Sequence, residues 1–305
     1  MRLALALISV AAVSTLALGP AADARSRADC ERDYRPQVGQ SGKDVVWVPT
    51  PDELVTKMLA MAKVTPKDYV VDLGAGDGKI AIAAGKKFGA TATGIEYNPD
   101  MARLAQCYVQ AEGVADKVKI IQGDIFKEDF SKATVVTMYL LPELNLCVRH
   151  RVLAMKPGTR VASHSFTMVE WEPDESFDAD HRNAYLWVVP ARVGGSWAFR
   201  NGNGSVDFTV SLTQSFQKIG GEVAIGGGRQ PLLGASLQGD SIRFAFTDTK
   251  GVTQHFTGAV HGTTIIGSLR ASGVADVDLA GKVQGALAPA PWAEMASACG
   301  RFYGK

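Results

Sequence analysis

The sequence predicts an α/β domain built on a doubly wound, mostly parallel sheet, followed by a small all-β domain. Between Pro51 and about Pro190, apolar runs of strand length alternate with segments of helical periodicity, which is typical of a parallel sheet covered by helices. Beyond Gly194 the pattern changes to short strands with period-two alternation, separated by glycine-containing turns. We therefore expect the first domain at residues 25–193 and the second at residues 194–305.

Residues 1–24 have the features of a cleavable secretory signal. A single basic residue, Arg2, precedes the apolar stretch Leu3–Leu18, and the small residues of Ala22-Asp23-Ala24 offer a cleavage site. The stretch is shorter than the ~20 apolar residues that a spanning helix needs, although an uncleaved anchor is the alternative. We therefore expect a mature chain that starts near Arg25, is periplasmic or secreted, and has no transmembrane segment.

The composition does not favour nucleic acid as a partner. The chain has 32 basic and 31 acidic residues and contains no basic run of the kind that binds nucleic acid. With 305 residues it is long enough for two hydrophobic cores.

The strands of the first domain place polar and aromatic side chains at one edge of its sheet. The expected strands are Tyr69–Leu73, Thr91–Glu96, Lys117–Gln122, Thr134–Tyr139, Arg160–His164 and Tyr185–Val189. In open α/β sheets, ligands bind outside the carboxyl ends of the strands. Asp72, Glu96, Asp124 and Tyr139 all fall at such ends, so the topology alone predicts that they converge on one crevice.

A glycine loop follows the first of these strands. Gly74, Gly76 and Gly78 alternate with other residues directly after Asp72. Glycines let the backbone approach a ligand where any Cβ would collide, and a plain strand-to-helix turn does not need three of them. The spacing is neither the Gly-x-Gly-x-x-Gly of dinucleotide enzymes nor a phosphate loop ending in Gly-Lys-Ser/Thr. The loop therefore predicts a different nucleoside ligand.

Two further acids refine the prediction for this ligand. Glu96 lies about twenty residues after the glycines, where a carboxylate accepts from both ribose hydroxyls. Asp124 ends the third strand and is placed to accept from the exocyclic amine of an adenine, with Ile125 and Phe126 flanking the ring. A nicotinamide enzyme does not need this third acid.

These motifs resemble those of the class I, seven-strand methyltransferases, which have a Rossmann-like fold and use S-adenosyl-L-methionine. Flanking segments narrow the resemblance to the seven-strand protein lysine methyltransferases of mitochondria, which modify membrane-transport and ATP-synthase subunits. The resemblance extends from about Val45 to Pro190 and implies S-adenosyl-L-methionine as cofactor and a methyl acceptor, possibly a protein. The flanking segments that carry it are Val48-Pro49-Thr50-Pro51, Tyr139-Leu140-Leu141-Pro142 and Val161–Phe166.

The resemblance also implies roles for three residues outside the cofactor motifs. Tyr139 and Pro142 would form the acceptor side of the site, and Thr50 would bind the amino-acid end of the cofactor. Each has a structural alternative: Tyr139 closing the core, Pro142 forming a turn, and Thr50 capping a helix with Pro51 at its first position and Glu53 three residues on.

The cysteines and histidines predict disulfide chemistry rather than a metal site. Cys30 and Cys299 lie near the two ends of the mature chain, and we expect them to pair, although sequence alone leaves the connectivity open. Cys107 and Cys147 fall on helical patterns and are expected to be buried thiols. The five histidines show no metal-ligand spacing, so no metal is expected.

The second domain is predicted to be a meander that closes into a small barrel. Residues 237–242 and 260–265 repeat a hairpin with a tight glycine-containing turn. Closure would remove the exposed sheet edges, and Gly194-Gly195-Ser196-Trp197 loosely resembles the opening of lipocalin-like barrels. No aromatic girdles of a membrane barrel are visible. We expect a structural role for this domain. Alternation is expected at Val206, Phe208, Val210 and Leu212, and again at Ile242, Phe244 and Phe246.

Three functions of different classes fit these features. The first is a methyltransferase acting on a protein lysine, and the second is a small-molecule methyltransferase of the same fold, because the fold does not decide the acceptor. The third is an exported, non-catalytic protein that binds a nucleoside or another ligand. The export signal favours this third function, since S-adenosyl-L-methionine is made in the cytoplasm.

Overall fold

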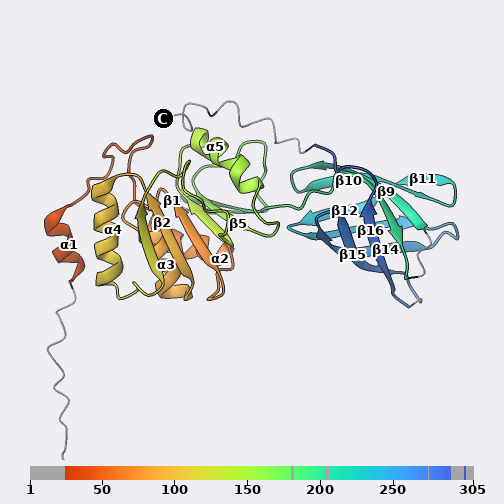
Figure 1. Ribbon diagram of the computed structural model, residues 1–305, viewed down its shortest axis with the longest axis horizontal. Coiled ribbons are helices and arrows are strands. Elements are labelled where there is room, and N and C mark those ends of the chain that lie inside the picture. Colours follow the sequence, from red (N-terminus) through yellow and green to blue (C-terminus); the bar gives the residue numbers. More distant parts are fainter. Residues whose placement is uncertain (1–24, 180–181, 203–205, 274, 290–298, 300–305) are drawn as a thin grey trace, which may run out of the picture.

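The computed structural model describes residues 25–179, 182–202, 206–273, 275–289 and 299, so the predicted leader lies outside the described residues. Figure 1 shows an α/β domain and a β domain side by side along the longest axis of the molecule. No described helix combines the length and the apolar character that crossing a membrane requires.

The α/β domain contains a seven-stranded sheet of the predicted, mostly parallel type. Its strand order is β3-β2-β1-β4-β5-β7-β6, in which the first five are parallel and β7 and β6 run antiparallel. The fold class predicted from the sequence is therefore confirmed. The strands are β1 (Tyr69–Leu73), β2 (Thr91–Glu96), β3 (Val118–Gln122), β4 (Val135–Met138), β5 (Arg160–His164), β6 (Glu175–Ala179) and β7 (Arg182–Val188).

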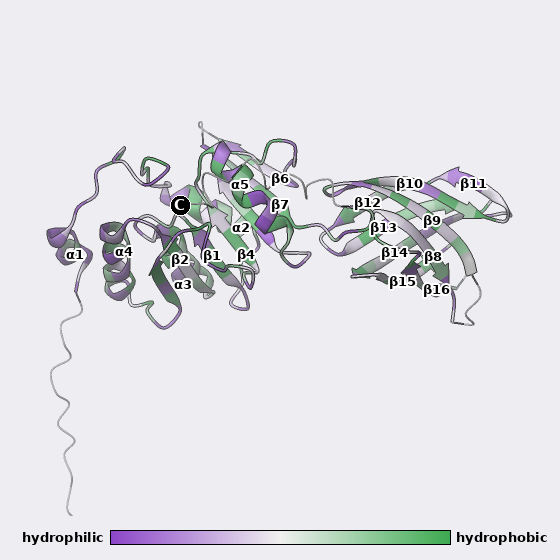
Figure 2. Cartoon of the chain, turned by 45° about the horizontal axis from the view of Figure 1, so that its top comes forward, coloured by the Kyte–Doolittle hydropathy of each residue, from purple (hydrophilic) through white to green (hydrophobic). Residues whose placement is uncertain are grey.

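Helices cover both faces of this sheet. Apolar residues of α2, α3 and α4 form one buried cluster with the sheet, and those of α5 form a second cluster. In Figure 2 the central strands between these helices are coloured mainly as apolar, as expected for strands buried on both faces. The helices are α1 (Arg27–Asp33), α2 (Asp52–Met61), α3 (Lys79–Phe88), α4 (Pro99–Ala111) and α5 (Pro142–Leu153).

The described disulfides differ from the predicted pairing. Cys30 of α1 bonds to Cys107 of α4, and Cys147 of α5 bonds to Cys299. The prediction that Cys30 pairs with Cys299 and that the two helix cysteines are free thiols is therefore wrong. Since α4 and α5 belong to the clusters on opposite faces of the sheet, each binds the chain end that packs beside it, which a sequence separation does not reveal.

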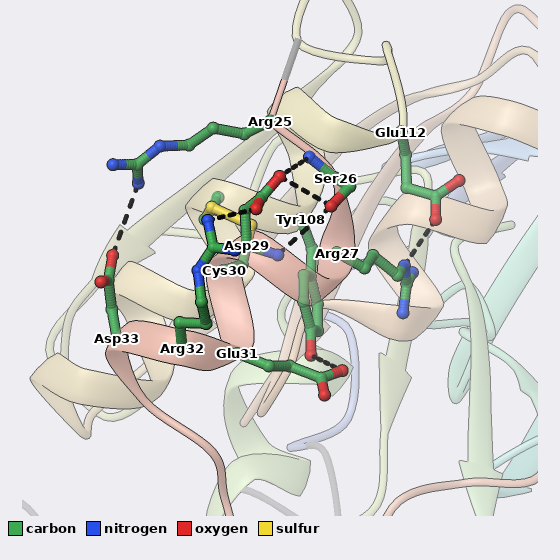
Figure 3. The surroundings of a disulfide bond; sticks show 11 residues. Arg25, Ser26, Arg27, Asp29, Cys30, Glu31, Arg32, Asp33, Tyr108 and Glu112 are labelled. Atoms are coloured by element: carbon green, nitrogen blue, oxygen red, sulfur yellow. Dashed lines mark hydrogen bonds and ion pairs between the residues drawn. A yellow bond between two sulfur atoms is a disulfide. The ribbon is translucent and has the colours of Figure 1, made fainter. Parts of the chain in front are cut away.

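The surroundings of the first disulfide show why α1 packs on α4 (Figure 3). The Tyr108 hydroxyl donates a hydrogen bond of 3.0 Å to Glu31, and the Arg27 guanidinium lies 4.4 Å from the centroid of the Tyr108 ring. Arg27 also pairs with Glu112 at the end of α4. Polar contacts and the disulfide together fix this short helix.

The β domain is a nine-stranded antiparallel sheet of order β11-β10-β9-β8-β16-β15-β14-β13-β12 that nearly closes, because β10 also contacts β12. Both predicted hairpins are confirmed, with two-residue turns at residues 239–240 and 262–263. The strands are β8 (Gly195–Arg200), β9 (Val206–Ser215), β10 (Lys218–Ile225), β11 (Gly228–Pro231), β12 (Leu233–Gln238), β13 (Ser241–Thr247), β14 (Thr253–His261), β15 (Thr264–Arg270) and β16 (Val277–Val283).

Aromatic rings fill the interior of the barrel. Phe199 and Phe208 stack with centroids 4.9 Å apart, and Phe256 stacks on Phe244 at 4.8 Å. The buried alternation predicted for β9 and β13 is confirmed at positions 208, 210, 212, 242, 244 and 246. These side chains form the packed core of the barrel.

The turn between β9 and β10 connects the barrel to the α/β domain. Phe216 stacks on Trp171 at 5.9 Å and joins the cluster formed by α5. Lys218 pairs with Glu172 at 2.6 Å. The two domains therefore share an apolar contact with a polar rim.

Candidate functional site

A cavity of about 290 Å³ lies at the carboxyl ends of β1 to β4. Its lining includes most of the site residues predicted from the sequence, and also the chain from residue 40 to residue 50, which precedes α2. The predicted residues that line it are Thr50, Asp72, Gly74, Gly76, Glu96, Asp124, Ile125 and Tyr139. Gly78 and Pro142 are outside the lining and begin α3 and α5.

The glycine loop leaves room for a ligand backbone in two ways. Gly76 has a φ of 55°, and a Cβ there would lie 2.7 Å from the indole nitrogen of Trp47. Gly78 has a φ of 77°, and its Cβ would press on Ala105 and Ile120 at 3.1 and 3.2 Å. Gly76 thus keeps the cavity wall thin, whereas Gly78 allows α3 to pack closely.

Glu96 is fixed in orientation by the backbone around it. Its carboxylate accepts hydrogen bonds of 2.8 Å from the amides of Gly76 and Asn98. Burial raises the pKa of Glu96, and these amides oppose the rise. The carboxylate is held at the cavity wall, where it has the orientation that two ribose hydroxyls require.

Asp72 is a buried acid beneath the loop. It is 2% exposed and accepts a hydrogen bond of 2.7 Å from the Thr137 hydroxyl. Burial raises the pKa of Asp72 to about 7, helped by the negative charges of Asp77 and Glu96. A cationic ligand would relieve this excess of negative charge.

Asp77 also lines the cavity, although it was not among the site residues predicted from the sequence. Burial raises the pKa of its carboxyl group, while Lys79 opposes the rise. The signal was present in the sequence as an acid inside the glycine loop. With Asp72 and Glu96 it gives three acidic groups around one part of the cavity.

Asp124 is already paired within the chain. Its Oδ2 lies 2.9 Å from the Lys43 ammonium, and its Oδ1 accepts from the Phe126 amide at 2.9 Å. Burial of Asp124 works against its ionisation, but the Phe126 amide and Lys43 hold its pKa below the usual value. Lys43 belongs to a small hairpin bridged at Ser41 and Val46, for which the sequence gave no prediction.

The opposite side of the cavity is apolar and aromatic. Leu140, Leu141, Leu144 and Phe166 line it beside Tyr139. These side chains can exclude water from a ligand that lies against them.

Thr50 does not cap α2, so that alternative is wrong. The helix begins at Asp52 with Pro51 as its N-cap and has no side-chain cap bond. The Thr50 hydroxyl instead forms a hydrogen bond of 3.0 Å with Nδ1 of His164. Thr50 is therefore available to the cavity that it lines.

The site has the features that a positively charged nucleoside cofactor needs. Fixed carboxylates suit hydroxyl and amine donors, glycines with positive φ let a ligand approach the backbone, and the buried acids suit a cation. The residues present therefore fit S-adenosyl-L-methionine. No group of three or more metal-ligating side chains occurs in the part of the chain that the structure describes.

Comparisons with known proteins give consistent matches. The family model of the ANTKMT methyltransferase domain matches residues 72–175. A protein-lysine N-methyltransferase of Saccharolobus islandicus is 41% identical over 48% of this chain and 94% of its own length. A human lysine N-methyltransferase that is named for an ATP synthase subunit is 33% identical over 40% of this chain, which spans only 51% of that relative.

Among solved structures, one described as an RNA methyltransferase from Salinibacter ruber in complex with S-adenosyl-L-homocysteine is 44% identical. The match covers 48% of this chain and 96% of that one, with a TM-score of 0.47. Each of these matches thus covers less than half of the present chain.

Proposed function

This chain belongs to the lysine N-methyltransferase family of class I enzymes, and on that premise we propose that it methylates a lysine side chain of a protein. It is an S-adenosyl-L-methionine-dependent methyltransferase. The names of its relatives specify protein lysines in general and a lysine of an ATP synthase subunit, and both support a protein acceptor.

One observation carries the proposal: a single cavity has buried carboxylates along one part and an apolar, aromatic wall along another. S-adenosyl-L-methionine supplies a methyl group activated by a sulfonium charge. In the proposed arrangement Glu96 binds the ribose and Asp124 the adenine amine. Asp72 and the glycine loop bind the amino-acid end together with Thr50.

The apolar wall has a chemical purpose if the acceptor is a lysine. A lysine ammonium must lose its proton before it can attack, and this costs about 4 to 5 kcal/mol at pH 7 from a pKa of ~10.4. Desolvation and a nearby cation both disfavour the ammonium. Tyr139, Leu140 and Phe166 offer such a dry surface. The transfer itself then depends mainly on positioning.

We also propose that the protein acts outside the cytoplasm after loss of residues 1–24. The leader sequence supports export, and the two disulfides support an oxidising compartment. The amino-terminal sequence of the protein recovered from a periplasmic or secreted fraction tests this location. A protein retained with residue 1 in the cytoplasm would contradict it.

The function is tested with the chain from Arg25 onward, S-adenosyl-L-methionine carrying a labelled methyl group, and separate protein and metabolite extracts. We expect label in methyl-lysine from hydrolysed protein. Label in metabolites alone would indicate the small-molecule enzyme, and cofactor binding without any transfer would indicate a non-catalytic binding protein.

Glu96→Ala is the matched control for cofactor binding. It removes a carboxylate that two backbone amides orient. Hydrogen bonds to charged groups contribute about 1.5 to 3 kcal/mol each, so we expect S-adenosyl-L-homocysteine to bind at least about tenfold more weakly by calorimetry. Unchanged affinity would place the cofactor elsewhere.

A further inference from the structure

His164 is a buried histidine next to the cavity that the proposed roles do not use. It ends β5, is 6% exposed, and does not itself line the cavity. Both of its close side-chain contacts, however, are residues that do. Its Nδ1 lies 3.0 Å from the Thr50 hydroxyl, and its ring centroid lies 3.8 Å from that of Tyr139.

These two contacts come from separate parts of the chain. Thr50 precedes α2, and Tyr139 directly follows β4. His164 is therefore the point at which the segment before α2 is connected to the end of β4. A side chain between two such segments fixes their separation.

The loop after His164 is itself held rigidly. The Ser163 hydroxyl donates to the Phe166 carbonyl at 2.8 Å, and the buried amide of Asn145 donates to the carbonyls of Phe166 and Thr167 at 3.2 Å. Ser165 has a φ of 64°, a conformation that a serine adopts only when its surroundings require it. The imidazole thus has little freedom to move.

We propose that His164 is a positioning residue for methyl transfer, which fixes the Thr50 hydroxyl and the Tyr139 ring at the acceptor end of the cavity. The proposal rests on the proposed function, because it assigns the acceptor end to the Tyr139 side. His164 acts through these two neighbours and does not touch the reacting atoms.

The alternative role for a histidine here, a base that deprotonates the acceptor, does not fit the surroundings. Burial lowers the pKa of His164 to about 4. At pH 7 the imidazolium is then about one thousandth of the population, so the ring is a poor proton acceptor. A neutral imidazole has one donor and one acceptor nitrogen and can hold the Thr50 hydroxyl in one orientation.

Two substitutions separate the two contacts of His164. His164→Asn keeps a polar atom near the position of Nδ1 but removes the ring, whereas His164→Phe keeps a ring but removes the hydrogen bond. We expect His164→Phe to lower kcat about 10- to 100-fold, because small misplacements at a reacting centre have effects of that size. The KM for the acceptor and the affinity for S-adenosyl-L-homocysteine should change less than about threefold.

A double-mutant cycle with Thr50→Val provides the readout that a merely structural role would not give. If His164 acts through Thr50, the double variant His164→Phe/Thr50→Val should have nearly the kcat of Thr50→Val alone. His164→Asn should recover part of the lost kcat. His255→Phe, an exposed site on β14 of the barrel, is the matched control and should leave kcat unchanged.

Additive effects in the cycle, or a wild-type kcat in His164→Phe, would overturn the proposal. A second measurement does not need turnover: the ring signals of Tyr139 in tyrosine-labelled protein, assigned with Tyr139→Phe, should shift in His164→Asn. Identical Tyr139 signals would also overturn it. A wild-type protein without any transfer would contradict the proposed function alone, since the Tyr139 signals still test the role of His164.

Discussion

The cores of the two domains differ in the polar groups they bury. Among the described residues, every buried polar or charged side chain lies in the α/β domain, and the barrel core is apolar. The polar set is Thr50, Asp68, Asp72, Thr137, Asn145, Arg149, Thr159, Ser163 and His164.

Burying polar groups is costly unless they are hydrogen-bonded, so their positions are informative. Thr50 and Asp72 line the cavity, and Thr137 and His164 bond to them directly. Others are structural: Asp68 accepts from Thr65 and Thr134 and pairs with Arg160. Polar burial alone therefore does not mark function, but polar burial connected to a cavity does.

The largest expected effect breaks the apolar side of this comparison. Phe256 is 1% exposed and packs against Phe199 and Phe244 at 5.0 and 4.8 Å. Phe256→Ala should lower the free energy of unfolding of the barrel by about 3 to 5 kcal/mol, the usual effect of removing a buried ring. Denaturant unfolding should show this loss, while calorimetry should show unchanged binding of S-adenosyl-L-homocysteine.

The matched control is Ile266→Ala on β15, because Ile266 is 57% exposed. We expect a change within about 0.5 kcal/mol. If Phe256→Ala also abolished cofactor binding under conditions where only the barrel unfolds, the two domains would have to be treated as one cooperative unit.

The sequence predicted regular structure well because the signals for it are local. The apolar runs of β1, β2 and β5 and the two barrel turns match the structure at their stated positions. β6 escaped prediction because this edge strand carries mostly exposed or half-buried residues. A strand without an apolar run lacks the signal that the others have.

The missed features depend on contacts between distant segments. Lys43 reaches Asp124 across 81 residues, and Thr50 reaches His164 across 114 residues. The pairing of Cys30 with Cys107 likewise depends on where α1 packs. The motifs located the cavity, but only the tertiary structure shows which side chains occupy its edges.

The polar side of the comparison is sharpened by Asp72→Asn. Burial raises the pKa of Asp72 from 3.8 to about 7, so the folded protein binds more protons than the unfolded chain between these values. The free energy of unfolding of the cofactor-free protein therefore falls as pH rises from about 4 to 7, by up to about 4 kcal/mol from this group. In Asp72→Asn this part of the pH dependence should disappear.

Denaturant unfolding at a series of pH values measures the difference between wild type and Asp72→Asn. Above pH 7 the variant should be the more stable protein without cofactor, yet it should bind S-adenosyl-L-methionine more weakly, because a carboxylate facing a cation is lost. In the wild type this affinity should rise as pH increases through about 7. Parallel stability profiles for the two proteins would show that Asp72 titrates normally.

The smallest expected effect concerns the other polar edge of the cavity. Lys43 occupies Asp124 Oδ2, the oxygen that remains after Oδ1 accepts from the Phe126 amide. If the adenine amine binds Asp124, it competes with this ammonium, whose side chain is 21% exposed and therefore partly screened by solvent. We expect Lys43→Met to tighten binding of S-adenosyl-L-homocysteine about two- to fivefold, in line with the modest strength of such pairs.

Calorimetry at low and high salt measures this effect. Salt weakens partly exposed ion pairs, so raising it should reduce the advantage of Lys43→Met over the wild type. Lys218→Met, which breaks an exposed pair with Glu172 on the barrel side, is the matched control and should leave affinity unchanged. Weaker binding in Lys43→Met would mean that the hairpin carrying Lys43 holds the cofactor rather than competing with it.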